Sequence, residues 1–467
     1  MAEQRPACAG HPHAFDWLRP RIREGVVSAG RRSMIKASVA GLAGLSLPGL
    51  LARRAAASPA QAAPSGKSVI LIWMTGGPSH IDTLDVKPQA PAEIRGPFGT
   101  IETRTPGLRV CEYLPQTAAI SDRLTVIRSV DPEKSNHQPN QVFQTGNRQA
   151  APRVNANGAQ YPAIASIVAK HHGPNHPAMP ASVALNVKDP THIAWGGYLG
   201  KKYDPFDARN VGKLFTPLAG LPFERIHDRQ TLRDRFERIE RGLDRSGSMD
   251  ALDDFQRQAI ELVTGRRAQH AFDLAAESAE VRERYGDHDW CQQALLARRL
   301  VESGVSFVTI DLSNHTSSGT WDTHGDNIPP YGGIWNGLRP LLPVFDRLYS
   351  TLITDLGERG LLDDVMVIAM GEFGRSPTLG TQGSTDGRNH WPYVMSMLLA
   401  GGGMRHGQVI GESEHDGGHI KSRPVTPGDL AATIYRHMRV PLDTMYLDFR
   451  GRPLAAVIDG APLAELV

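Results

Sequence analysis

Cysteine is scarce in this chain of 467 residues, which contains only 3, and no Cys-x-x-Cys pair occurs. A zinc site built from thiolates is therefore not expected, because such sites use closely spaced cysteines. The two cysteines beyond the N-terminal region, Cys111 and Cys291, could form a disulfide in an oxidising compartment, and the sequence leaves both states open.

The chain also lacks an excess of charge of either sign. It holds 51 lysines and arginines against 49 aspartates and glutamates. Such a balance gives no general attraction to nucleic acid or to an acidic membrane surface. Neither is therefore expected as a partner.

No apolar run is long enough to predict a membrane span. Residues 37–51 form a modest apolar stretch that glycine and proline interrupt. It follows a basic segment, residues 31–36 (RRSMIK), and precedes an A-x-A-like site at residues 60–62. These are the three parts of a secretory signal. We predict that residues 1–63 are a twin-arginine leader directing the chain to the periplasm or cell surface; the alternative is a disordered arm with a chance arginine pair.

Short apolar runs alternate with helical patterns over the rest of the chain. Strands are predicted at residues 68–74, 124–130, 182–187, 305–312 and 365–370, and helices at 161–171, 287–302, 338–359 and 427–437. This alternation predicts an α/β domain over residues 64–467, with a mostly parallel sheet and helices on both faces. Residues 223–284 are charged and favour helix, so we expect a helical insertion there.

Ligands of open α/β sheets gather at the carboxyl ends of the strands. That rule selects the loops at residues 75–85, 131–146, 311–327 and 371–391, which also hold clusters of Asp, Glu, His and Asn. Chemistry is therefore expected at one edge of the sheet.

Five side chains in these loops are candidate metal ligands: Asp82, Asp322, His324, Glu372 and His390. Mixed carboxylate and imidazole ligands suit Zn, Mn or Fe better than Ca alone. The alternative for Asp82 is a tight turn with solvated carboxylates. The density of such residues around Asp322 and His324 favours the metal site.

Three further residues are candidate catalytic groups. His137 could act as nucleophile, general base or extra ligand. Arg375 and Arg388 could hold the oxygens of a phosphate or sulfate. The alternatives are an ordinary helix cap near His137 and a structural salt bridge for Arg375.

A late polar loop, residues 414–419 (EHDGGH), follows a glycine-rich turn. It could supply one more ligand to the same site. The competing interpretation is a solvated loop beside it.

Several motifs occur together in one order along the mature chain: TGGPSHIDTLD, RGPFGTIET, EYLP, IRSV, TGN, TWDTHGDN, GEFGRSP, GRNHWP and GRPL. With these motifs the chain resembles the Domain of Unknown Function 1501 family. That family is similar in pattern to the alkaline phosphatase and sulfatase superfamily, which implies an α/β sandwich with a metal site at the strand ends. The chain departs from the superfamily near His137, where no Ser, Thr or Cys nucleophile stands, and Glu372-Phe373-Gly374 replaces the Asp-His-Gly of sulfatases.

Two functional hypotheses follow. The first is an exported hydrolase of small-molecule or glycan phosphate or sulfate esters that depends on a divalent metal ion such as Zn, Mn or Ca. The second is a non-catalytic scaffold of the same fold that binds a sulfated or phosphorylated glycan or a cell-surface partner. The convergence of the predicted ligands in space distinguishes them.

Overall fold

A computed structural model describes residues 65–133, 140–150, 160–211, 265–380 and 383–467. The predicted leader and His137 lie outside the described residues. The chain divides into two compact units, Met1–Ser58 with Met445–Leu454, and Pro59–Thr444 with Ala455–Val467. Apart from the hairpin of β15 and β16, the elements below belong to the second unit.

An eight-stranded sheet forms the centre of the second unit, in the order β12-β4-β11-β8-β1-β7-β5-β6. Only β11 runs antiparallel to its neighbours, β4 and β8; the other pairings are parallel. The strands are β1 (Ser68–Trp73), β4 (Leu124–Val130), β5 (Ser182–Leu185), β6 (Phe206–Asp207), β7 (Phe307–Asp311), β8 (Val365–Met370), β11 (Met395–Gly401) and β12 (Gln408–Ile410).

The inner strands are mostly apolar because both faces of the sheet are covered. Every residue of β1, β7, β8 and β11 is buried. The register pairs Ile70 of β1 with Val308 of β7 and Val367 of β8. Apolar side chains therefore pack against each other across neighbouring strands. In this register the carboxyl ends of β1, β7 and β8 lie at the same edge of the sheet.

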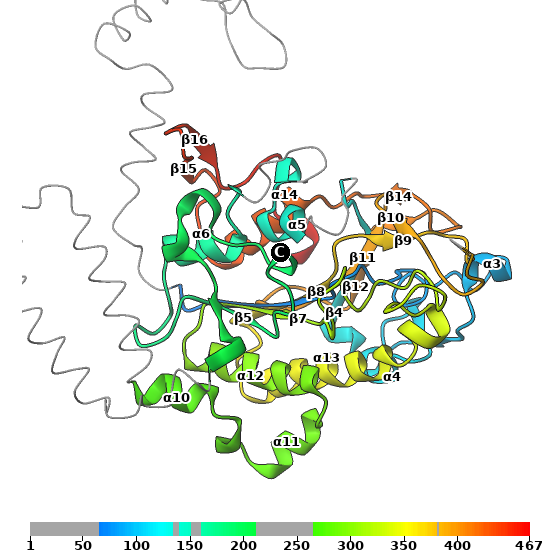
Figure 1. Ribbon diagram of the computed structural model, residues 1–467, viewed down its shortest axis with the longest axis horizontal. Coiled ribbons are helices and arrows are strands. Elements are labelled where there is room, and N and C mark those ends of the chain that lie inside the picture. The colour runs from blue at the N-terminus through cyan, green and yellow to red at the C-terminus, as the bar shows by residue number, and fades with distance from the viewer. Residues whose placement is uncertain (1–64, 134–139, 151–159, 212–264, 381–382) are drawn as a thin grey trace, which may run out of the picture. The chain divides into compact units, whose positions relative to one another are not determined.

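Helices lie on both faces of this sheet (Figure 1). One face carries α12 (Asp289–Ser303) and α13 (Leu341–Glu358), and the other carries α5 (Asn140–Thr145), α6 (Ile164–His171) and α14 (Pro427–His437). The mixed α/β architecture with a mostly parallel sheet, predicted from the alternation of patterns, is confirmed.

The described residues also form smaller elements. The other α-helices are α3 (Ala92–Arg95), α4 (Pro115–Ala119), α10 (Arg266–Phe272) and α11 (Ala279–Tyr285). Four two-stranded sheets pair β2 (Thr100–Glu102) with β3 (Arg109–Cys111), β9 (Gly374–Arg375) with β10 (His390–Trp391), β13 (Glu412–Ser413) with β14 (Ile420–Ser422), and β15 (Met445–Leu447) with β16 (Pro453–Ala455). The described end of the expected insertion, residues 265–284, is helical in α10 and α11.

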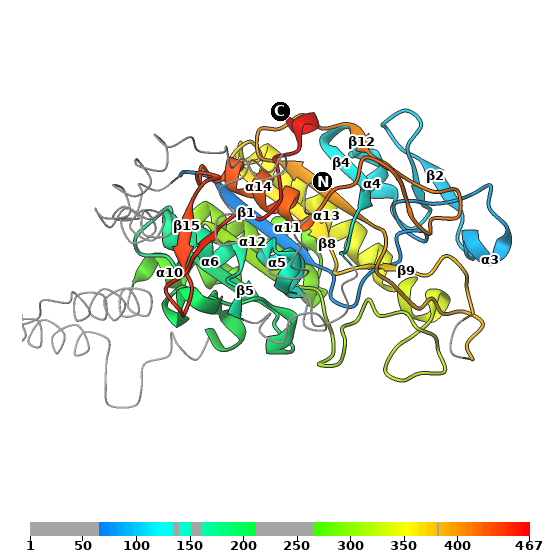
Figure 2. The same ribbon diagram turned by 90° about the horizontal axis from the view of Figure 1, so that it is seen from above.

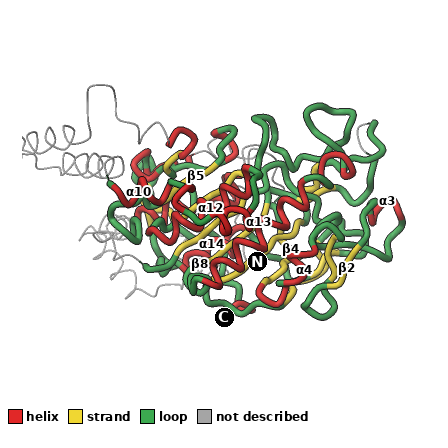
Figure 3. The backbone as a smooth tube through the Cα atoms, turned by 90° about the horizontal axis from the view of Figure 1, so that it is seen from below, coloured by secondary structure: helices red, strands yellow, loops and turns green. Residues whose placement is uncertain are grey.

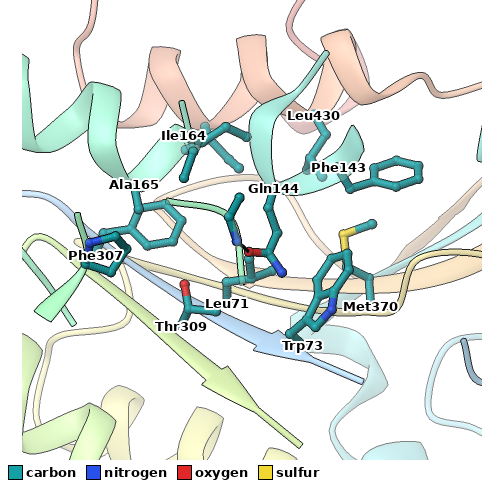
Figure 4. A pocket seen from close by; sticks show the side chains of 14 residues that line it. Leu71, Trp73, Phe143, Gln144, Ile164, Ala165, Phe307, Thr309, Met370 and Leu430 are labelled. Atoms are coloured by element: carbon teal, nitrogen blue, oxygen red, sulfur yellow. Dashed lines mark hydrogen bonds between the residues drawn. The ribbon is translucent and has the colours of Figure 1, made fainter. Parts of the chain in front are cut away.

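A small hollow lies between the sheet and the helices α5, α6 and α14. Figure 4 shows Leu71, Trp73 and Thr309 facing Ile164 and Leu430 across it. Its lining contains no titratable side chain. The hollow therefore has no acid, base or metal ligand with which to do chemistry.

Two findings bear on expectations about compartment. Cys111 and Cys291 are both buried and free, so they do not form a disulfide with each other. Among the described residues, no helix has both the length and the apolar character that crossing a membrane requires.

Candidate metal centre

The parallel strands β1, β7 and β8 end at the same edge of the sheet, and their following loops meet there. In Figure 2, β9 lies beyond the carboxyl end of β1, and Figure 3 shows loops crowded at that end of the sheet. The loop after β7 carries Asp322 and His324, and the β9–β10 hairpin after β8 carries Arg375 and His390. The topology thus brings together residues that lie more than 60 positions apart.

Asp322, His324 and His390 form a compact group whose ligand atoms lie within 4.8 Å of one another. The two Nε2 atoms of His324 and His390 are 2.8 Å apart. Asp322 Oδ1 lies 3.0 Å from Nε2 of His324 and 3.4 Å from Nε2 of His390. Asp322 and His324 are buried, and His390 is half-buried.

These separations fit a tetrahedral ion. Zinc ligands about 2.0–2.1 Å from the metal are separated from each other by about 3.3 Å. The three observed separations, 2.8, 3.0 and 3.4 Å, lie within about 0.5 Å of that value. One carboxylate and two imidazoles therefore form a donor set that could hold a divalent ion with a coordination position left for water or substrate.

Arg375 holds Asp322 in place. Its Nη2 lies 2.5 Å from Asp322 Oδ1. Its Nε donates to the carbonyl of Gly77 at 2.8 Å, and its other donors reach the carbonyls of Gly76 and Arg388. Because Arg375 is fully buried and bonded to protein on these sides, it orients Asp322 rather than facing open space.

Two glycines allow the loops to approach this closely. A Cβ on Gly76, which has φ +118°, would lie 2.4 Å from the backbone nitrogen of Asp322. A Cβ on Gly387 would lie 1.5 Å from the carbonyl oxygen of His324. Any side chain at either position would push the ligand-bearing loop away.

Glu372 lies next to this group but is not one of its three members. It lies two residues after the end of β8 and is fully buried. Its Oε1 accepts the backbone N–H of Gly76 at 2.9 Å. Since Gly76 abuts Asp322, the carboxylate of Glu372 fixes the turn that supports the ligand loop.

The structure does not bring Asp82 into the group. Its carboxylate is paired with Arg388, with Nε–Oδ2 and Nη2–Oδ1 distances of 2.6 and 3.1 Å. Arg388 also donates to the carbonyls of Ser376, Pro377 and Ile94. These five contacts match the five N–H groups of a guanidinium, so Arg388 bonds to acceptors of the protein itself rather than to the anionic group of a ligand.

Sequence reasoning missed a second buried charge pair at the same edge. His192 Nδ1 lies 3.0 Å from Asp311 Oδ2, and His192 Nε2 lies 2.8 Å from the carbonyl oxygen of Ser317. Asp311 ends β7 and also accepts the hydroxyl of Thr75 at 2.5 Å. Because ligands gather at the carboxyl ends of strands, the loop after β5 was also a candidate. It was not selected, since His192 does not belong to a cluster of such residues along the chain.

The surroundings of His192 favour its protonated form. Both of its ring nitrogens face acceptors, so both contacts are hydrogen bonds only when both nitrogens carry a proton. Burial lowers the pKa of His192, but the hydrogen bond and charge of Asp311, with the Ser317 carbonyl, raise it above the ordinary 6.5. A buried His–Asp pair whose contacts favour the protonated imidazole therefore lies at the same edge of the sheet as the candidate metal centre.

Comparison with known proteins identifies the family. Residues 66–467 match the family model described as "Protein of unknown function (DUF1501)". The chain belongs to this family. The resemblance drawn from the motifs is confirmed, and no curated protein matches the chain.

Solved structures similar to the chain include three enzymes. A sulfatase from Pseudoalteromonas sp. has 14% identity and a TM-score of 0.35, with 88% of this chain and 72% of that one covered. A phosphonate monoester hydrolase from Silicibacter pomeroyi has 13% identity and a TM-score of 0.35, with 85% and 78% covered. The soluble domain of a phosphoethanolamine transferase from Neisseria meningitidis has 12% identity and a TM-score of 0.33, with 81% and 90% covered.

Removing either imidazole should abolish tight metal binding. We expect His324→Ala and His390→Ala to weaken the affinity for Zn²⁺ or Mn²⁺ by more than about 100-fold, because each removes one of three ligands. Isothermal titration of metal-stripped protein measures this. His415→Ala, which changes an exposed histidine, is the matched control. Equal metal affinity in all four proteins would contradict the site.

The His192–Asp311 pair should make stability depend on pH. Because the folded pKa of His192 is raised above 6.5, its contribution is complete below pH 6.5 and is lost as pH rises through the folded value. We expect the free energy of unfolding in urea to fall on this alkaline side in the wild type and not in His192→Gln.

His406 provides the control of opposite sign. Burial lowers its pKa, so it weakens the fold on the acid side of 6.5 and adds no alkaline fall. His406→Gln should therefore keep the wild-type decline above pH 6.5. An alkaline decline that persists unchanged in His192→Gln would refute the pair's role.

Proposed function

We propose that this protein is an exported, metal-dependent hydrolase of phosphate or sulfate monoesters. The observation that carries the proposal is the grouping of Asp322, His324 and His390 at the carboxyl edge of the sheet. These three residues would hold the divalent ion. When bound, such an ion lowers the pKa of a water molecule and polarises the ester oxygen.

The residues around the trio would keep the ligands ready for that reaction. Arg375 fixes the position of Asp322, and Glu372 fixes the Gly76 turn beneath it. Preorganised ligands avoid a reorganisation cost when the substrate arrives. In the hydrolysis, the oxygen of water bonds to phosphorus or sulfur, the bond to the ester oxygen breaks, and the leaving oxygen takes up a proton.

His137 remains a predicted nucleophile, base or extra ligand. It lies outside the described residues, so its part in the proposal comes from the sequence alone. The environments of Arg375 and Arg388 give both a positioning role in this proposal, since their donors already bond to carboxylates and carbonyls. Neutralisation of the transferred group would then fall to the metal ion.

One observation favours the alternative of a non-catalytic binding scaffold. The two arginines chosen from the sequence as anion clamps are both fully buried and bonded to protein. A site with an ion but without such clamps could bind an ester without turning it over. The scaffold proposal therefore expects metal-dependent binding and no hydrolysis.

Turnover by metal-loaded protein decides between the two proposals. We expect release of p-nitrophenol from p-nitrophenyl phosphate or sulfate, lowered by more than about 100-fold in His324→Ala and by chelation. His415→Ala should retain wild-type rates. Rates at background for the metal-loaded wild type on both esters would favour the scaffold.

Export is proposed from residues 31–36 and the apolar stretch that follows. Replacing Arg31 and Arg32 with lysine should leave the chain in the cytoplasm, as fractionation of cells and immunoblotting would detect. The second arginine pair of the leader, Arg53 and Arg54, gives the matched control, and its replacement should leave export intact. Unchanged export of the first variant would exclude the twin-arginine route.

A further inference from the structure

Three aromatic rings gather near the candidate metal ligand His390, and none of the three belongs to the proposed ligand set. Trp391, Tyr393 and His419 form this aromatic platform. Ring centroids are 5.1 Å apart for Trp391 and Tyr393, 5.9 Å for Trp391 and His419, and 5.4 Å for Tyr393 and His419. Tyr393 is 42% exposed, and His419 is also exposed.

The platform is built into the fold. Trp391 lies in β10, where it pairs with Gly374 of β9. Its indole Nε1 donates to the carbonyl of Gly418, and the carbonyl of Gly417 bonds to Nε2 of buried His80 at 2.8 Å. The β13–β14 loop is thus fixed against the hairpin that carries His390; Figure 1 shows β9, β10 and β14 at the same end of the molecule.

The platform begins at the residue that follows a candidate metal ligand in the chain. Trp391 follows His390 directly, so their Cα atoms are about 3.8 Å apart, and the Cα of Tyr393 is at most about 11 Å from that of His390. One or two sugar rings span such a distance. A group joined to an ester at the metal centre could therefore contact these rings.

Charge and polarity restrict what would bind there. Residues 412–421 contain three carboxylates, those of Glu412, Glu414 and Asp416, and one ammonium, that of Lys421, which leaves a net charge of −2. Glu412 pairs with Lys421 at 2.9 Å, and the ammonium of Lys87 contacts Ser413 of the same loop. The carboxylates of Glu414 and Asp416 are the charges that would disfavour a second anionic group. Aromatic faces beside carboxylates and imidazoles suit an uncharged sugar ring, whose C–H faces stack while its hydroxyls form hydrogen bonds, better than an acyl chain.

We propose that the aromatic platform is a subsite for an uncharged sugar ring next to the ester-bearing group, so that the substrates are esters at the end of otherwise neutral glycans. This deepens the proposed function and rests on it for the placement of the ester. The recognition of the sugar belongs to Tyr393, Trp391 and His419 alone.

The test compares galactose 6-sulfate and galactose 6-phosphate as monosaccharides with the same esters at the end of a neutral trisaccharide. Binding to metal-loaded protein is measured by calorimetry, and KM and kcat are measured where turnover occurs. Tyr393→Ala and His419→Ala should weaken trisaccharide binding by about 3- to 10-fold and leave kcat unchanged. Neither variant should affect the monosaccharides or the affinity for Mn²⁺.

Trp335→Ala is the matched control, because Trp335 is another aromatic residue of similar exposure, 41%, outside the platform. It should bind every ligand as the wild type does. If the trisaccharide binds no better than the monosaccharide, the subsite is overturned even when the esters are hydrolysed. If it binds in a Tyr393-dependent way without turnover, the subsite stands and the hydrolase proposal fails. If the two variants lose as much affinity for p-nitrophenyl esters, the platform binds an aryl group and the sugar subsite is overturned.

Discussion

The guanidinium of Arg375 joins the three loops from which the candidate site is built. It bonds to the carbonyls of Gly76 and Gly77 after β1, to Asp322 after β7, and to the carbonyl of Arg388 in its own hairpin. A buried cation is tolerated only when a carboxylate and hydrogen-bond acceptors compensate for lost water. The contacts that bring the loops together around Arg375 therefore also position Asp322, a candidate metal ligand.

The same constraint recurs along this edge of the sheet. Asp82 is balanced by Arg388, and Asp311 by His192. These pairs remove from the site several charges that the sequence suggested were available to a ligand. His324 and His390 differ from these charge pairs, because their contact joins two imidazoles. The Nε2 atoms of the two rings lie 2.8 Å apart. A cation bound by both imidazoles and by the carboxylate of Asp322 would stabilise this arrangement of the three side chains.

Much of the fold follows from the sequence because buried parallel strands are continuous apolar runs. The runs now forming β1, β4, β5, β7 and β8 were all recognised, with ends within three residues. The antiparallel strand β11 was missed, since a short apolar run such as Met395–Gly401 is compatible with a buried helix as well as with a strand. Its direction depends on which neighbours it meets, and that is a property of the whole sheet.

The candidate residues that crowd one loop lie together in the structure, whereas pairs of distant partners were not anticipated from the sequence. Asp322 and His324 were found because they are two residues apart in a loop dense with such groups, and His390 because it lies in a motif near a strand end. Asp82 was expected among the ligands, but its partner Arg388 is 306 positions away. Spacing along the chain cannot reveal such a pair, nor the pairing of His192 with Asp311.

The buried pairs also divide the proposed recognition into two physical parts. With Arg375 and Arg388 bonded to protein, the negative charge of an ester would be met chiefly by the ion that Asp322, His324 and His390 would hold. An uncharged ring on the aromatic platform would be bound through contact area and hydrogen bonds, which need no ion. Affinity for the ester group should thus depend on metal, whereas the added affinity of the sugar should not. Removing the metal would then lower the affinity for every ester while preserving the order among their neutral glycan portions.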